Sequence, residues 1–151
     1  MVEGNRTLVE RIFQDAEFIQ SLGIGLTGSG KGWCETRLDC ARSHRQQHGF
    51  IHAGVVMTLA DHTCGGAAAS AMAEDRDVIT VENKVSFLRP AAGQSLTCRA
   101  EVLRAGKNIV FVEAQVMIEG TDGPTMVAKA SSTLRVIPRQ SDFRSGTTPK
   151  Q

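Results

Sequence analysis

The 151-residue sequence lacks an excess of charge of either sign, and this absence restricts its partners. The formal net charge is +1, and no long run of basic or acidic residues occurs. Binding to nucleic acids and to membrane surfaces depends on clustered basic residues, so no nucleic-acid partner is predicted. We expect a chain of this kind to act through a local site.

Cysteine motifs and targeting signals are also missing. The four cysteines show no C-x-x-C spacing, and no basic and apolar signal peptide opens the chain. The longest apolar run is interrupted by Asp61 and His62, which makes it a poor membrane span. These features predict reduced thiols and a cytoplasmic protein without a membrane partner.

The most distinctive stretch is the segment 46–72, where a polar loop leads into one long apolar helix. From Val55 to Met72 the helix is apolar on every side, which is typical of a buried helix. It contains one acid, Asp61, on a stripe of small residues that includes Gly65. A carboxylate there needs a wet edge, a basic partner or a function. The small residues indicate the close approach of a strand, a second subunit or a substrate.

The remaining pattern predicts one more helix and a meander of strands. Apolar residues recur at helical spacing over 5–22, with Asn5 or Thr7 as the cap. A turn is expected over 28–32. Strands are expected over 23–27, 33–40, 78–88, 95–103, 108–118 and 125–137.

These elements together predict an α+β domain over residues 1–137. An antiparallel sheet would curl around a central helix of about 53–72. In the strand 78–88, alternation predicts one apolar face, formed by Ile79, Val81, Val85 and Phe87. Residues 138–151 are polar and are expected to form a disordered tail. The sheet edges favour a homo-oligomer.

Two motifs in the sequence imitate known binding sites. The segment 25–32 resembles a phosphate-binding loop, but Gly32 replaces the Ser or Thr that binds magnesium, and a strand follows instead of a helix. We interpret it as a glycine-rich hairpin turn. His44, His48, His52, Asp61 and His62 suggest a metal site, but Gly49 and Gly54 interrupt a helix that would align the histidines. No metal and no cofactor is predicted.

A third interpretation joins the start of the central helix to its acid. If the helix begins near Ala53, the free N–H groups of its first turn can stabilise developing negative charge. Asp61 could then act as nucleophile or general base, and Gln46 could position water or the carbonyl. His52, beside the helix start, could orient the loop by hydrogen bonding. A serine nucleophile is not supported, because no G-x-S-x-G motif occurs.

Two segments resemble a known family. The run Gly49-Phe-Ile-His-Ala-Gly54, continued by Val-Val-Met-Thr-Leu-Ala-Asp61, resembles the H-G-G-x-x-x-x-L-x-D signature of hotdog-fold acyl-CoA thioesterases of the phenylacetic-acid-pathway (PaaI-like) type. The strand from Thr80 to Ala91 resembles the family's second recurring segment, which ends in a Leu-Arg-Pro-Ala-like turn. Together the matches extend over about 22–137.

The resemblance implies roles for individual residues. Asp61 would be the catalytic carboxylate, the amide of Ala53 would polarise the thioester carbonyl, and Gln46 would replace the family's Asn or Gln. Thr80 would help to place the water, across a dimer interface from Asp61 or close to it. The chain departs from the family at Ala53, where Gly is usual: Ala serves if φ is negative, but a positive φ would distort the oxyanion hole.

The resulting prediction is a thioesterase that hydrolyses a small or medium acyl-CoA, aromatic acyl groups included, with coenzyme A as part of the substrate. His52, Gly54 and Arg89 would contact that substrate, and Arg104 and Lys107 are further candidates for its phosphates. A dimer would be the smallest active unit, within a tetramer. Two alternatives stay open: an acyl-CoA-binding or regulatory module without turnover, and an acyl hydratase or dehydratase that uses His48 or His52 with Asp61.

Overall fold

The structure is a computed structural model that describes residues 7–139, and its elements follow one another as two short helices, two strands, a long helix and four more strands. The helices are α1 (Leu8–Asp15), α2 (Glu17–Leu22) and α3 (Ala53–Ser70), and a short 3-10 turn spans Arg42–His44. The strands are β1 (Ile24–Gly30), β2 (Trp33–Asp39), β3 (Arg76–Phe87), β4 (Ser95–Ala105), β5 (Ile109–Gly120) and β6 (Gly123–Pro138).

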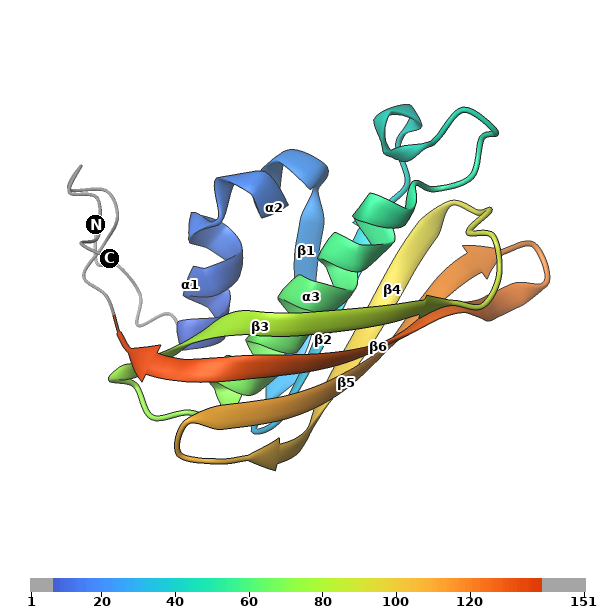
Figure 1. Cartoon of the computed structure of the whole chain (residues 1–151). Helices are drawn as coiled ribbons and strands as arrows, with labels where there is room; N and C mark the ends of the chain where they lie inside the picture. Colours follow the sequence, from blue (N-terminus) through green and yellow to red (C-terminus); the bar gives the residue numbers. More distant parts are fainter. Residues whose placement is uncertain (1–6, 140–151) are drawn as a thin grey trace, which may run out of the picture.

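All six strands form one antiparallel sheet that curls around α3. The strand order is β1-β2-β4-β5-β6-β3, so β1 and β3 form the two edges. Figure 1 shows α3 lying across one face of the twisted sheet, with α1 and α2 beside it at the β1 edge. This is the predicted α+β architecture, a hotdog fold with α3 as its centre.

The central helix begins at the predicted residue and is buried because its side chains are small. Leu59, Ala60, Cys64 and the run 67–69 have almost no exposed surface. Thr63 is also buried, but its hydroxyl bonds the carbonyl of Leu59 at 2.6 Å and shares a 2.7 Å hydrogen bond with Thr36 of β2. This buried hydroxyl pair satisfies both side chains and links the helix to the sheet.

The N-terminal helix predicted over 5–22 is wrong as a single helix. The chain breaks at Ala16, which has an extended conformation with φ −84° and ψ 94°. Val9 and Phe13 lie on one face of α1 and are buried, whereas Ile19 would point about 120° away from Phe13 in a straight helix, because six residues correspond to about 600° of rotation. The break lets Ile19 enter the core. Thr7 forms the predicted cap with Glu10, while Asn5 lies outside the described residues.

The glycine-rich segment and the end of the chain also differ from expectation. Gly28–Gly30, predicted as part of a turn, belongs to β1 and pairs with the start of β2, so the turn contains only Lys31 and Gly32. A Cβ at Gly30 would collide with the indole of Trp33, which lies over this strand. Pro138, assigned to the tail, is the last residue of β6, and residues 140–151 lie outside the described part.

The predicted apolar face of β3 is wrong for Ile79 and Val81, because the strand contains a bulge, whereas Val85 packs against the core as predicted. Ile79 pairs with Arg135 and Thr80 with the buried Leu134, but the register shifts between Thr80 and Glu82. Thr80 therefore faces α3, and Ile79 is 53% exposed on the other side. Val81, at the bulge, is 64% exposed. A bulge of this kind turns one side chain from one face of a sheet to the other.

We expect Gly66→Ala to destabilise the fold, because the new Cβ would lie 2.7 Å from Sγ of Cys34 and 3.1 Å from the ring of Phe13. Overpacking of this kind costs about 1–3 kcal/mol of unfolding free energy. Gly65→Ala is the matched control, since no atom lies within 4 Å of its Cβ position. It should be neutral or stabilising by up to about 1 kcal/mol. Urea unfolding measures both, and equal effects of the two substitutions would contradict the packing argument.

Candidate active site

The first turn of α3 leaves one backbone donor without a partner. His52 is the N-cap, and its Nδ1 accepts the N–H of Gly54 at 2.8 Å. The N–H groups of Val55 and Val56 donate to the carbonyl of His52. Within residues 7–139, the N–H of Ala53 has no hydrogen-bond acceptor. An unpaired N–H at the positive end of a long helix is suited to bind an anionic oxygen.

The backbone conformation at Ala53 allows alanine in this place. Ala53 is the first residue of α3, and no described residue other than glycine has a positive φ. The Cβ of Ala53 therefore does not strain the helix start. With alanine in place of the family's glycine, the N–H of residue 53 still points along the helix axis as in a regular helix. His52 also has a fixed tautomer, because Nδ1 is an acceptor and the ring proton must lie on Nε2.

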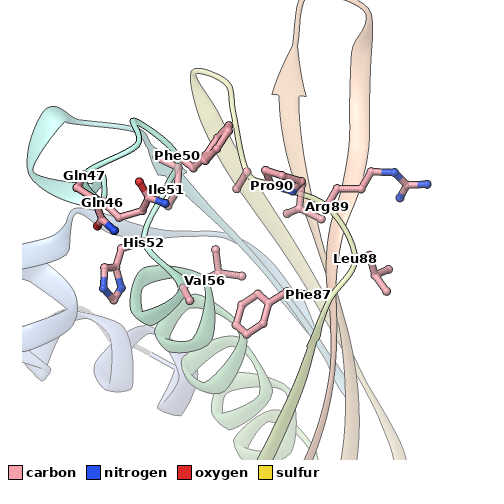
Figure 2. A pocket seen from close by; sticks show the side chains of 13 residues that line it. Gln46, Gln47, Phe50, Ile51, His52, Val56, Phe87, Leu88, Arg89 and Pro90 are labelled. Carbon is pink, nitrogen blue, oxygen red and sulfur yellow. The ribbon is translucent and has the colours of Figure 1, made fainter.

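A pocket of about 560 Å³ lies in front of this helix start. Gln46, His52 and Ala53 form its polar end, and Figure 2 shows Gln46 and His52 on the same side of the pocket. The remaining wall is mostly apolar and comes from the loop before α3, the first turn of α3, the end of β3 and β6. Its members are Gln47, Phe50, Ile51, Val56, Phe87, Leu88, Arg89, Pro90, Ala91 and Val127.

Asp61 and Thr80 form a second polar group, away from that pocket. The hydroxyl of Thr80 donates to Oδ1 of Asp61 at 2.9 Å, within one chain. Asp61 is half-buried on α3, and Thr80 reaches it because the bulge in β3 turns the hydroxyl toward the helix. Eight residues separate Asp61 from Ala53, which corresponds to roughly 12 Å along the helix axis. A carbonyl bound to the N–H of Ala53 is therefore out of reach of Asp61 in the same chain.

The four histidines occupy separate environments. His44 is buried and its Nδ1 accepts the N–H of Ala41 at 3.0 Å, while His48 lies exposed in the loop before α3. His62 packs edge-on against Phe13 with ring centroids 4.5 Å apart. Burial lowers the pKa of His62, and the nearby Asp61 carboxylate opposes that shift. Within residues 7–139, no group of three or more His, Cys, Asp or Glu side chains could hold a metal ion.

The basic residues predicted to meet substrate phosphates do not form one cluster in a single chain. Arg89 lies at the rim of the pocket, but its guanidinium donates to the carbonyl of Met126 at 2.8 Å and points away from the pocket in Figure 2. Arg104 and Lys107 lie at the β4–β5 turn, at the opposite end of the sheet. Gly54 is not among the residues that line the pocket, and its N–H donates to Nδ1 of His52.

The sequence profile of the thioesterase superfamily matches residues 48–124, which include the helix start, Asp61 and Thr80. The chain belongs to the thioesterase superfamily. A thioesterase family protein from Silicibacter pomeroyi has a similar structure, with 34% identity, a TM-score of 0.84 and coverage of 87% of this chain and 96% of that one. This chain is accordingly a thioester hydrolase.

Two further comparisons show similar proteins. A conserved protein from Pseudomonas aeruginosa is 32% identical with a TM-score of 0.74, over 81% of this thioesterase and 94% of that chain. A relative from Listeria monocytogenes, a 1,4-dihydroxy-2-naphthoyl-CoA hydrolase, is 26% identical over 100 residues, which are 66% of this chain and 81% of its own. None of the helices in the described part of this thioesterase is long and apolar enough to span a membrane.

The cysteines are poor candidates for a nucleophile in this thioesterase. All four are unpaired, and three of them lie in the core. Burial raises the pKa of Cys34 and of Cys64 to about 12, and it also raises the pKa of Cys98. A thiol reacts as its thiolate, so these three are almost entirely in the unreactive protonated form near neutral pH.

We expect iodoacetamide at pH 8 to modify Cys40 first, because Cys40 is only half-buried, and although burial raises its pKa, Arg45 and Arg37 oppose that shift. The other three thiols should react only after unfolding in guanidinium chloride, since raised pKa values reduce the thiolate at every pH below them. Mass spectrometry of tryptic peptides measures the labelling. Modification of Cys64 in the native protein as fast as that of Cys40 would contradict the expected order of reactivity.

Proposed function

We propose that this thioesterase hydrolyses a small or medium acyl-CoA, aromatic acyl groups included, to the free acid and coenzyme A. The observation that carries the proposal is the unpaired N–H of Ala53 at the mouth of an apolar pocket. An apolar pocket with few polar groups at one end suits an acyl chain whose carbonyl binds at that end. The hydrolase activity of the Listeria relative on an aromatic acyl-CoA supports the same substrate class.

The proposed active site combines two subunits. Within one chain, Asp61 lies roughly 12 Å along the helix from Ala53, so the carboxylate must come from a second chain to reach the same thioester. The free edge of β3 supports such a dimer, because Ile79 and Val81 expose apolar surface beside Thr80. We propose that a dimer is the smallest active unit and that it forms part of a tetramer. Each subunit is the single domain 1–137. The proposed location is the cytoplasm, where the four unpaired cysteines stay reduced.

The proposed reaction uses the backbone, one carboxylate and water. The N–H of Ala53 and the side-chain amide of Gln46 donate to the thioester oxygen as it becomes negative. Asp61 of the partner subunit takes a proton from water that attacks the carbonyl carbon, or attacks that carbon itself before water releases the acid. Thr80 holds one oxygen of the carboxylate, which leaves the other oxygen for the reaction. The thiol of coenzyme A leaves with the proton, and the products are an acid and a thiol.

The alternative function, an acyl hydratase or dehydratase, would require a histidine that acts together with Asp61. Nδ1 of His52 already accepts the N–H of Gly54 as the helix cap, so this nitrogen cannot take a proton from a substrate. His48 is exposed in the preceding loop. The geometry therefore favours hydrolysis. Arg89 and the substrate contacts of His52 and Gly54 stay part of the proposal, with His52 Nε2–H as the donor that remains available.

We expect Asp61→Asn to reduce kcat/KM for acyl-CoA hydrolysis by at least roughly 100-fold, because the amide can neither accept the proton nor attack the carbonyl. Asp39→Asn is the control, since Asp39 is exposed and pairs only with Arg37. Release of coenzyme A from short-chain and aromatic acyl-CoAs provides the assay. Retained activity in Asp61→Asn would contradict the assigned role of Asp61.

Mixing two variants of strongly reduced activity tests the two-subunit site. Asp61→Asn and Gln46→Ala should complement each other when they are unfolded and refolded together, because each mixed dimer contains one site with both groups intact. The mixture should regain about a quarter of wild-type activity, since half of the dimers are mixed and each holds one intact site of two. Refolding each variant alone is the control. No recovery in a mixture that forms mixed dimers would show that both groups act within one chain.

We expect Thr80→Val to lower kcat roughly 10- to 100-fold, because a hydrogen bond to a charged carboxylate is worth about 1.5–3 kcal/mol. Thr80→Ser keeps the hydroxyl and should retain most of the activity. Steady-state kinetics of both variants, with thermal unfolding to verify the fold, separates the hydroxyl from packing. Equal losses in the Ser and Val variants would indicate that the methyl group, and not the hydrogen bond, is required.

A further inference from the structure

The turn before α3 is closed by its own backbone and by one arginine. The N–H of Gln46 donates to the carbonyl of Phe50 at 2.8 Å, and the N–H of Gly49 donates to the carbonyl of Gln46 at 2.9 Å. Gly49 has a φ of +88°, which other residues rarely adopt. The guanidinium of Arg45 donates to the carbonyl of Gly49 at 2.8 Å. Gln46 is thus part of a tight turn, although the turn projects from the sheet.

The same guanidinium connects this turn to a second loop. Its other terminal nitrogen donates to the carbonyl of Gly93 at 3.2 Å, forty-eight residues away in the sequence. Within residues 7–139, the only other hydrogen bond between the two segments is that of the Ile51 N–H, which donates to the carbonyl of Ala91 at 2.9 Å. In this described part of the chain, Arg45 is therefore the one side chain that links the turn to the 91–94 loop by hydrogen bonds.

The 91–94 loop is itself a rigid support. Ala91 is buried, and a Cβ at Gly93 would collide with the carbonyl of Glu119 at the end of β5. The N–H of Gln94 donates to that carbonyl at 3.2 Å, and the carbonyl of Gln94 accepts the N–H of Cys40 at 2.8 Å. The loop is thus fixed to the sheet from two sides, so a turn that is attached to it has a fixed position.

Gln46 lines the polar end of the pocket, where a small displacement of its side-chain amide would change the distance to a bound thioester oxygen. Its side-chain oxygen accepts the N–H of His48, so the amide NH2 remains as the donor group at the polar end of the pocket. We propose that Arg45 is a positioning residue that holds this turn against the 91–94 loop and so places the Gln46 amide on the thioester oxygen. This inference rests on the proposed function. A guanidinium can link the two loops because its planar, rigid group donates to two carbonyls at once, whereas a lysine ammonium presents its donors on a single nitrogen atom.

The decisive experiment is a double-mutant cycle between Arg45 and Gln46. Arg45→Met keeps the apolar stem and removes the donors, and we expect kcat to fall roughly 10- to 100-fold, as for a group displaced by about 1 Å, with a smaller change in KM. In the Gln46→Ala background, Arg45→Met should change kcat by less than about twofold, because the group that it positions is gone. Arg45→Lys should restore part of the activity. Arg37→Met is the matched control, since Arg37 forms a surface ion pair with Asp39 and lies outside the turn and the 91–94 loop.

Hydrogen exchange at the N–H groups of Gln46 and Gly49 provides a readout that does not depend on activity. Both should exchange faster in Arg45→Met than in the wild type and in Arg37→Met, because the turn is released from its support. Two results would overturn the role of Arg45, provided that the wild-type enzyme hydrolyses acyl-CoA. One is unchanged hydrogen exchange in Arg45→Met, and the other is an equal loss of kcat on Arg45→Met in the wild-type and Gln46→Ala backgrounds. A wild-type protein without hydrolysis would instead overturn the proposed function, and this role with it.

Discussion

The hydrogen bonds at the start of α3 determine which backbone donor is available to the proposed active site. The first N–H groups of a helix have no acceptor within the helix, and His52 provides one for three of the four in the first turn of α3 through its ring and its carbonyl. Among the described residues, the N–H of Ala53 has no acceptor, and it lies at the mouth of a pocket. The same N-cap that stabilises the helix therefore leaves one donor free, and His52 is held in one tautomer by the hydrogen bond that it accepts.

Small side chains in the second half of α3 make that start possible. Gly66 lies so close to Cys34 and Phe13 that a Cβ would overlap with both, and the alanines that follow have almost no exposed surface. The sheet can therefore curl tightly around the helix and fix its axis. A fixed axis gives the helix dipole and the N–H of Ala53 a fixed direction, so that packing far from the pocket contributes to its geometry.

Composition predicted the central helix, because a long apolar segment that follows a polar loop has few alternatives, and its start was expected near Ala53. Which side chains of β3 face the helix could not be predicted from alternation, because alternation assumes an unbroken strand. The extra residue at Val81 exchanges the two faces on one side of the bulge. The break at Ala16 was missed for a similar reason: no glycine or proline marks it, and only the burial of Ile19 explains it. Arg45 carried no signal in the sequence, because its partners are backbone carbonyls of two loops.

The bulge in β3 joins the two halves of the proposed site. By shifting the register it turns the hydroxyl of Thr80 toward Asp61, and the same shift leaves Ile79 and Val81 exposed along a free edge. A regular strand would place Thr80 on the other face, and Asp61 would lose its partner. Thr80, which hydrogen-bonds the Asp61 carboxylate, therefore also lies next to the exposed apolar residues Ile79 and Val81. Because Asp61 cannot reach the N–H of Ala53 in its own chain, this exposed apolar edge is where the second chain of the proposed dimer would bind.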